Sequence, residues 1–333
     1  MLKKILQKYF VKKFYPCIKR DWYVDKGYVG LDDQERFDHF IKMQKSEDAI
    51  FYKEFQHVCL SRQFIQTKNN EKLDSVLITP KNPININNKE LYFVFFQGRG
   101  EYYESRFRDM AVQCIKTGAS IFGFNPKGFG CSSGNTRILN DIVEDGIWVI
   151  KYLIDKYNLS PSQIILQGNS LGAGVQEMIN EYFKQNFGFN FRQINSNSFK
   201  TLSSVIVCRY KLSFLEFLIK PILIYADWEI IPGENFYSTG IYKCMLKRLG
   251  DRTILKQAEF YHMINIDQDN EKCPDNYKAV NKYLYNNCQL ILDDKEIDPH
   301  LPSLNHFYYI DNGVKRSVYE LINIYIIESN KYI

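Results

Sequence analysis

The sequence of 333 residues lacks any uninterrupted apolar segment of about 18 residues, the length that a membrane-spanning helix needs. We therefore expect no transmembrane segment. The N-terminus also lacks the continuous apolar stretch of a secretory signal peptide, so we expect a cytoplasmic protein, with export by another route left open. The eight cysteines are scattered and include no C-x-x-C pair, which argues against a disulfide framework and favours a reducing compartment.

Motifs for metal ions and nucleotide cofactors are missing too. There is no H-E-x-x-H, no G-x-x-x-x-G-K-[ST], and the cysteines and histidines lack the spacing of metal ligands. Gly98 and Gly100 alone are too short for a dinucleotide-binding fingerprint. We predict neither a metal ion nor a cofactor.

Acidic residues are absent from one segment, residues 1–20, which carries seven basic residues. The rest of the chain then holds 36 basic and 38 acidic residues, so the body is not basic and a nucleic-acid partner is not expected. Residues 2–14 place apolar side chains at helical spacing, with lysines on the other side. Two interpretations stay open: a helix packed on the body with its lysines in solvent, or peripheral membrane contact through residues 1–20.

The order of expected elements predicts an N-terminal helical extension over residues 1–50 and an α/β domain over residues 51–333. A second helix is expected from Asp32 to about Lys45. Three strands open the domain, and further strands then alternate with helices. Strands are expected over 55–60, 62–67, 72–78, 91–96, 120–124, 163–167, 191–194, 242–247 and 289–292, and helices over 103–117, 140–157, 173–187 and 314–328. This alternation predicts a mostly parallel central sheet with helices on both faces.

Three glycine-rich segments follow expected strands, at residues 97–100, 125–134 and 168–172. Because the carboxyl ends of parallel strands meet at one edge of a sheet, we expect these segments to converge there. The third, Gly168-Asn169-Ser170-Leu171-Gly172, has the pattern G-x-S-x-G between a strand and a helix. That pattern is typical of a nucleophilic serine on a strained turn, so Ser170 is our candidate nucleophile.

These segments resemble the α/β-hydrolase superfamily from about residue 55 to the C-terminus. The chain departs from the usual pattern at Pro126 and Lys127, where Tyr and Arg are common, and at Gln97, where many members have His. The resemblance implies an oxyanion hole formed by the N–H groups of Leu171 and Arg99. More narrowly, residues 125–174 and 197–199 resemble the SidB-like α/β-hydrolases of Legionella and related intracellular bacteria, which implies a bacterial effector secreted to act inside a host cell.

A nucleophilic serine needs a histidine base and an acid that orients it, in the chain order Ser, Asp, His. For the acid, Asp251 follows the expected strand 242–247 and is preferred, because the strand that precedes the histidine should follow the acid directly, and Asp227 is the alternative. For the base, His300 lies closest after the last expected strand, and His306 is the alternative. His262 is expected to be structural, because no strand separates it from Asp251.

The sequence thus predicts a serine hydrolase that cleaves a carboxylic ester or thioester through a Ser170 acyl-enzyme, as an esterase, lipase or thioesterase does. An acyl lipid or acylated protein is the expected substrate, partly because residues 203–224 are mostly apolar. That segment is interpreted as a lid or cap, or alternatively as ordinary core helix. A peptidase or amidase with the same triad, and a catalytically silent binding protein on the same scaffold, are the alternatives.

Overall fold

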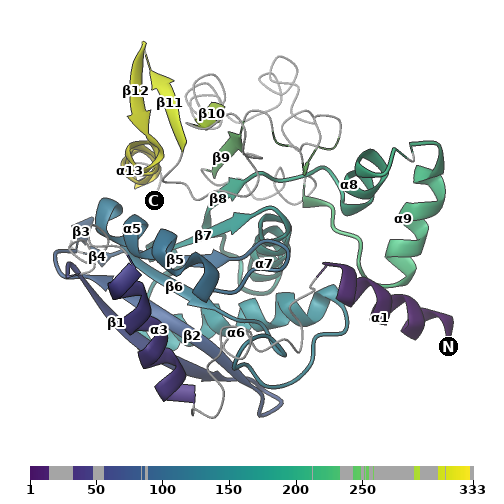
Figure 1. Ribbon diagram of the computed structural model, residues 1–333, viewed down its shortest axis with the longest axis horizontal. Helices are drawn as coiled ribbons and strands as arrows, with labels where there is room; N and C mark the ends of the chain where they lie inside the picture. Colours follow the sequence, from purple (N-terminus) through teal and green to yellow (C-terminus); the bar gives the residue numbers. More distant parts are fainter. Residues whose placement is uncertain are drawn as a thin grey trace.

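A mixed sheet forms the centre of the computed structural model (Figure 1). The structure describes residues 1–14, 33–47, 56–83, 85–86, 89–211, 213–232, 243–248, 251, 253–254, 258, 289–292, 307–311 and 313–330. Within these residues ten strands form one sheet, in the order β1-β2-β6-β5-β7-β8-β9-β10-β11-β12.

The strands of this sheet are parallel in the middle and antiparallel at both sides. They are β1 Val58–Gln66, β2 Lys72–Pro80, β5 Tyr92–Phe96, β6 Ser120–Phe124, β7 Ile164–Asn169, β8 Arg192–Ser196, β9 Lys243–Arg248, β10 Gln289–Leu292, β11 Phe307–Asp311 and β12 Val314–Ser317. Strands β6, β5, β7, β8, β9 and β10 pair in parallel, which confirms the predicted mostly parallel sheet. Two short strands, β3 Asn85–Ile86 and β4 Lys89–Glu90, form a separate hairpin that was not predicted.

Helices cover both faces of the sheet and bury its alternating side chains in two apolar cores. They are α1 Leu2–Phe14, α3 Asp33–Glu47, α5 Phe107–Thr117, α6 Leu139–Tyr157, α7 Leu171–Phe187, α8 Leu202–Arg209, α9 Glu216–Tyr225 and α13 Val318–Ser329, with short 3-10 turns η1 Glu104–Arg106, η2 Pro161–Gln163 and η3 Ser213–Leu215. One core contains side chains of α3, α5 and α13, and the other those of α1, α6, α7 and α8. None of the helices in the described ranges is long and apolar enough to cross a membrane.

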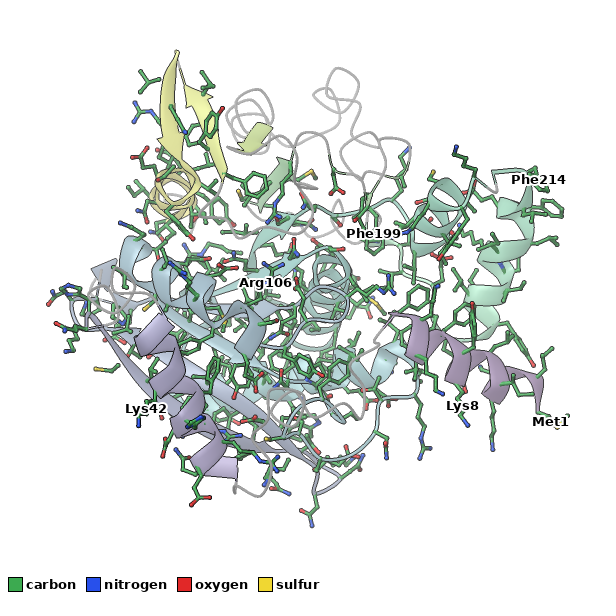
Figure 2. All side chains as sticks on the ribbon, viewed as in Figure 1. Met1, Lys8, Lys42, Arg106, Phe199 and Phe214 are labelled. Atoms are coloured by element: carbon green, nitrogen blue, oxygen red, sulfur yellow. The ribbon has the colours of Figure 1, made fainter. Side chains whose placement is uncertain are left out.

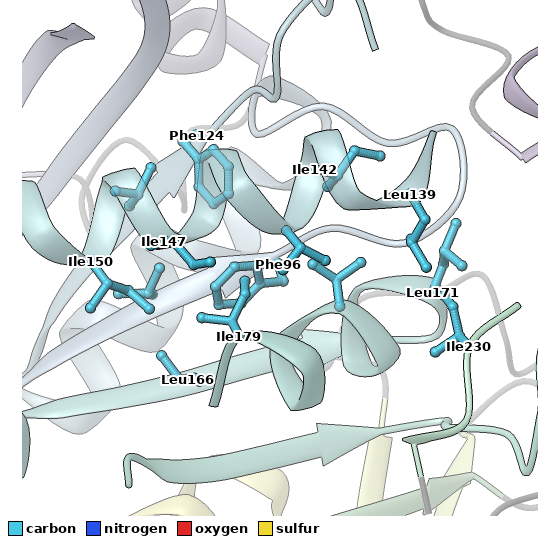
Figure 3. Close-up of a cluster of buried hydrophobic side chains, with 14 of the residues drawn as sticks. Phe96, Phe124, Leu139, Ile142, Ile147, Ile150, Leu166, Leu171, Ile179 and Ile230 are labelled. Carbon is cyan, nitrogen blue, oxygen red and sulfur yellow. The ribbon is translucent and has the colours of Figure 1, made fainter. Parts of the chain in front are cut away.

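Figure 3 shows the second core, where Phe96 of β5 and Phe124 of β6 meet the helices that cover them. Ile147 and Ile150 of α6 and Ile179 of α7 are almost completely buried there. The strands on this side carry continuous apolar runs, as is typical of parallel strands covered on both faces.

Local sequence signals explain where the central helices begin and end. The carboxylate of Asp141 accepts hydrogen bonds from the backbone N–H groups of Arg137 (2.7 Å) and Ile138 (3.1 Å), which satisfies two donors at the start of α6. Gly118 caps the end of helix α5 and Gly188 caps the end of α7, with φ of 62° and 72° respectively. Such left-handed positions favour glycine, because glycine has no Cβ to clash.

Two predicted boundaries were wrong. The expected strands 55–60 and 62–67 are one strand, because β1 pairs with β2 without interruption from Val58 to Gln66. The last helix does not begin at Val314, since residues 314–317 pair as β12 with the unpredicted strand β11. Helix α13 begins only at Val318, where the Ser317 hydroxyl accepts the Glu320 N–H.

Two helices, α1 and α3, lie in the predicted N-terminal extension, and two others, α8 and α9, lie in the predicted lid segment. Helices α1 and α3 lie on opposite sides of the sheet, since Phe14 belongs to one core and Phe40 to the other. The segment 203–224 falls within α8 and α9, which stand together between β8 and β9 in the chain and beside α1 in space (Figure 1).

Candidate active site

Ser170 occupies a strained turn between β7 and α7. Its backbone has φ 53° and ψ −117°, a combination that a non-glycine residue rarely adopts. The Ser170 N–H donates a hydrogen bond to the carbonyl oxygen of Ser196 in β8 (2.9 Å), which holds the turn against the neighbouring strand. The predicted strand–turn–helix context of the G-x-S-x-G pattern is therefore confirmed.

The two glycines of the pattern are required by close backbone contacts. A Cβ added to Gly168 would lie 2.6 Å from the backbone of Ala173. A Cβ added to Gly172 would overlap the backbone of Phe96 and Gln97 at the end of β5. The first turn of α7 therefore packs directly on the end of the neighbouring strand, which only glycine permits.

The strand register brings the predicted loops to one edge of the sheet. Phe96 is paired with Gly168, and Asn169 is paired with Ser196, so the chain leaves β5, β7 and β8 at the same level. Gln97 is buried at this edge, where its Nε2 donates a hydrogen bond to the carbonyl oxygen of Phe124 (2.8 Å). Gln97 thus ties the loop after β5 to the end of β6.

An ion-paired carboxylate braces the loop that contains Arg99. The Gly98 N–H donates to Glu101 Oε2 (2.7 Å), and the Glu101 carboxylate also accepts from Arg106 Nε (2.9 Å). Burial alone lowers the pKa of Arg106, but the charges and hydrogen bonds of Glu101 and Asp109 together outweigh it and raise that pKa. The Arg106 guanidinium therefore stays charged and neutralises the Glu101 carboxylate.

The two predicted oxyanion donors, Leu171 and Arg99, belong to the walls of the same cavity as Ser170. Leu171 is the first residue of α7, so its N–H has no acceptor within the helix. The positive end of the α7 dipole also lies beside Ser170. The Arg99 side chain points to α1, where its Nε donates to the carbonyl oxygen of Lys13 (2.8 Å).

A cavity of about 550 Å³ opens onto Ser170. Its walls come from α1, the loop after β5, the turn at Ser170, the segment after β8, α8 and the segment after β9. The lining residues are Tyr9, Phe10, Lys13, Phe14, Gly98, Arg99, Glu101, Asn169, Ser170, Leu171, Phe199, Leu202, Val205, Ile206, Arg209, Tyr210, Thr253 and Ile254. Most of them are aromatic or aliphatic, as is typical of small-molecule sites.

Of the two candidate acids, Asp251 is held beside this cavity. It follows β9, and its Oδ1 accepts hydrogen bonds from the backbone N–H groups of Thr253 (2.8 Å) and Ile254 (2.9 Å), both of which line the cavity. Asp227 is engaged elsewhere: its carboxylate binds Lys3 Nζ (2.9 Å) and Gln7 Nε2 (2.9 Å) of α1. Neither acid is itself a lining residue, but only Asp251 is hydrogen-bonded to residues that are.

The histidines named as candidate bases, His300 and His306, lie outside the described residues, as does His262. Strand β10, which precedes His300 and His306 in the chain, pairs in parallel with β9, the strand that leads to Asp251. Which histidine serves Ser170 stays a prediction.

The glycine-rich loop at residues 125–134 reaches the same edge but braces the fold instead of lining the cavity. Lys127 is buried, with its Nζ 3.4 Å from Asp145 Oδ1, and its N–H donates to Asp145 Oδ2 (2.7 Å). Burial raises the pKa of Asp145 to about 7, although the charge of Lys127 acts in the opposite direction. Pro126 and Phe129 line a second, small void together with Gln97 and Gly98.

Several cavity residues were not predicted from the sequence. Tyr9, Phe10 and Phe14 of α1 form one wall, although helical spacing had marked them only as an apolar side. Glu101 was also missed, because nothing in the local sequence shows that its carboxylate turns back to Gly98. The only available signal was the spacing of Glu101, three residues after Gly98 in the loop after β5, which permits a hydrogen bond between the two.

Known proteins show limited similarity to the chain. No protein-family model matches the chain. Over 159 residues it is 28% identical to a putative alpha/beta hydrolase of Acanthamoeba polyphaga mimivirus, a match that covers 47% of this chain and 57% of the relative. The chain therefore spans little more than half the length of that relative.

Solved structures similar to the chain include an esterase of Pyrococcus furiosus, with 19% identity, a TM-score of 0.46 and coverage of 62% of this chain and 75% of the esterase. An esterase of Pyrobaculum calidifontis has 13% identity, a TM-score of 0.43 and coverage of 67% and 76%. The chain itself has a mostly parallel central sheet among its described strands and a serine on a strand-to-helix turn. In these features, and in its sequence match to the mimivirus relative, the chain is similar to α/β-hydrolases.

Proposed function

We propose that the chain is a serine hydrolase that cleaves a carboxylic ester or thioester with Ser170 as nucleophile. The observation that carries the proposal is the strained Ser170 in the wall of a mostly apolar cavity. Asp251 accepts hydrogen bonds from two residues of the same wall, Thr253 and Ile254. Strain at a single buried turn residue is uncommon, and it is typical of functional sites. The relative named as a putative alpha/beta hydrolase supports the same reaction class.

In the proposed reaction the Ser170 Oγ attacks the carbonyl carbon of the substrate, and its proton passes to the histidine base, for which His300 is preferred and His306 is the alternative. The tetrahedral intermediate collapses, and the alcohol or thiol leaves with the proton from the histidine. Water then attacks the acyl-enzyme by the same steps in reverse, which releases the acid and restores Ser170. Asp251 orients the histidine throughout.

Negative charge develops on the carbonyl oxygen during both attacks. The proposed donors to this oxygen are the N–H groups of Leu171 and Arg99, and the start of α7 adds its dipole. Removing one such donor typically costs about 3 kcal/mol of transition-state stabilisation. The Glu101 carboxylate, which would oppose this charge, is neutralised by Arg106.

The cavity walls favour an acyl group as the substrate part that binds beside Ser170. Phe10, Phe14 and Leu202 offer apolar contacts there. Burying each methylene of an acyl chain contributes about 0.8 kcal/mol. An acyl lipid or an acylated protein therefore fits the proposal better than a polar ester, and α8 serves as part of a cap over the site.

The decisive experiment is labelling of the purified protein with a fluorophosphonate probe, together with turnover of p-nitrophenyl esters of increasing chain length. We expect labelling and turnover in the wild type and neither in Ser170→Ala. Ser198→Ala is the matched control, because Ser198 is also buried and follows the neighbouring strand β8. It should keep both.

Labelling that persists in Ser170→Ala would refute the nucleophile. A wild-type protein that neither reacts with the probe nor turns over any ester, yet binds fatty acids, would instead support a catalytically silent binding protein. Hydrolysis of amides in preference to esters would move the proposal to the peptidase or amidase alternative.

A further inference from the structure

Helix α9 exposes apolar side chains on most of its circumference. Phe217 is 71% exposed and Ile224 is 54% exposed, whereas Leu223 is completely buried and anchors the helix. Phe214, just before the helix, is 70% exposed and projects from the end of the molecule in Figure 2. An exposed apolar surface of this extent marks an interaction site in most proteins.

Helix α1 extends this apolar surface. Lys3 of α1 joins the two helices, because its Nζ binds Asp227 at the end of α9 and lies over the ring of Tyr225, 5.8 Å from the centroid. Beside this contact Leu2 is 61% exposed and Ile5 is 56% exposed. Figure 1 shows α1 and α9 next to each other at one end of the molecule. We call this region the α1–α9 surface; its apolar part comprises Leu2, Ile5, Phe214, Phe217, Ile224 and Tyr225.

A row of lysines borders the apolar part. Lys4, Lys8 and Lys12 follow one another at intervals of four residues, so they share one face of α1, and all three are exposed. Helix α1 contains no acidic residue. The carboxylate of Asp227, which contacts α1, is already bound by Lys3 and Gln7. Among the described residues, no acidic side chain forms an ion pair with Lys4, Lys8 or Lys12, so the α1–α9 surface combines exposed apolar groups with positive charge.

We propose that the α1–α9 surface binds to lipid bilayers that contain anionic lipids. Aromatic and aliphatic groups can enter the boundary between head groups and acyl chains, while the lysine row contacts the anionic head groups. A second copy of the same chain is the less suitable occupant, because a symmetric contact through this surface would oppose two lysine rows. Charge complementarity thus selects the bilayer.

Given the proposed function, on which this step rests, bilayer binding would also place the cavity close to the lipids that serve as its substrate. Tyr9 belongs to the cavity wall and is 57% exposed on α1. Lys13, Arg99 and Arg209 line the same cavity, so an anionic head group would be attracted to it. An acyl lipid could therefore pass from the bilayer along α1 to Ser170.

The test is co-sedimentation of the full chain with vesicles of phosphatidylcholine alone and of phosphatidylcholine mixed with phosphatidylserine. We expect binding to the mixed vesicles, weaker binding at high salt, and little binding to phosphatidylcholine alone. Reversal of Lys4, Lys8 and Lys12 to Glu should lower the partition coefficient by at least about tenfold. The matched control reverses Lys42 of α3, Lys68 of the turn between β1 and β2, and Lys116 of α5, which are also exposed, and it should bind as the wild type does.

The apolar part is tested by Phe217→Ser combined with Ile224→Ser, which should also release the protein from the mixed vesicles. Ile327→Ser is the control, because Ile327 is 58% exposed on α13 and should not affect binding. Far-ultraviolet circular dichroism and thermal unfolding check that each variant is folded. Ser170→Ala should bind as tightly as the wild type, so a failure of the proposed catalysis does not affect this test.

The proposal would be overturned if the two triple-reversal variants bound the mixed vesicles equally well. It would also be overturned if the wild type bound neither kind of vesicle. A stable dimer in size-exclusion chromatography with light scattering that Phe217→Ser and Ile224→Ser convert to a monomer would overturn it as well. In that case the surface would be an interface between copies of the chain.

Discussion

Arg99 Nε donates a hydrogen bond to the carbonyl oxygen of Lys13, at a distance of 2.8 Å. This contact joins the last turn of α1 to the loop that is proposed to supply an oxyanion donor. Helix α1 therefore forms a cavity wall and also helps to fix the loop that faces Ser170.

Replacement of Arg99 by Ala tests this link. The variant keeps the backbone N–H proposed to bind the oxyanion and loses only the side-chain contact with α1. A single hydrogen bond contributes about 1 kcal/mol, so we expect kcat for p-nitrophenyl butyrate to fall on the order of fivefold. Lys12→Ala, a change at an exposed neighbour on α1, should have no such effect. An Arg99→Ala enzyme with wild-type kcat would show that the tether is irrelevant to catalysis.

Asn substitutions distinguish the two candidate acids. Asp251→Asn keeps the shape of the side chain but removes the charge that would hold the histidine in its active tautomer, so kcat should fall by roughly 10⁴. Asp227→Asn loses the ion pair with Lys3, an exposed contact, and should change kcat at most a few-fold. Steady-state kinetics of both variants with one ester are the measurement. A reversed order of the two losses would assign the role to Asp227.

A methyl group at Gly172 should not fit. The Cβ of Gly172→Ala would overlap the backbone of β5, which cannot move without disrupting the sheet, so we expect a loss of about 3 kcal/mol or more in the free energy of unfolding. Gly188→Ala is the matched control, because its Cβ meets nothing within 4 Å and only the φ of 72° opposes it. That control should cost about 1 kcal/mol. Urea titrations monitored by circular dichroism give both values, and equal losses would contradict the close contact.

The buried carboxyl of Asp145 predicts a pH dependence of stability. In the folded chain burial raises its pKa to about 7, whereas an Asp in the unfolded chain titrates near its ordinary pKa of about 3.9. Between these values the folded state binds a proton that the unfolded state has lost. The stabilisation is therefore complete below about pH 4 and is lost as the pH rises to about 7, by up to about 4 kcal/mol.

Asp145→Asn should lack this contribution. The measurement is the free energy of unfolding of wild type and variant at several pH values between 4 and 8. We expect the wild-type value minus the variant value to decrease as the pH rises through this range. A difference that increases with pH would mean that the ion pair with Lys127 outweighs the effect of burial.

Much of the fold could be predicted because the central strands carry local signals. The run 91–96 and the shorter run 164–166 are apolar, and a glycine follows each within two residues, so β5 and β7 were expected within two residues of their observed bounds. Strand β12 was missed because its four residues carry no alternating pattern and pair only with β11, which was itself not predicted.

The candidate site was predictable to the extent that its parts follow strands. Gly98, Arg99 and Ser170 were placed at one edge because parallel strands share the direction of their ends. Glu101 and the aromatic residues of α1 were not, since their positions depend on how side chains and a distant helix pack after the sheet has formed.

The sequence by itself determined the parallel sheet and the turn at Ser170, because strand propensity, helix capping and backbone strain act between near neighbours in the chain. Only the tertiary structure separated Asp251 from Asp227 in their surroundings and made α1 a wall of the cavity. The physical reason is that the contacts of α1 with Asp227 and with Arg99 join residues more than 80 positions apart, and no local pattern encodes which distant surfaces meet.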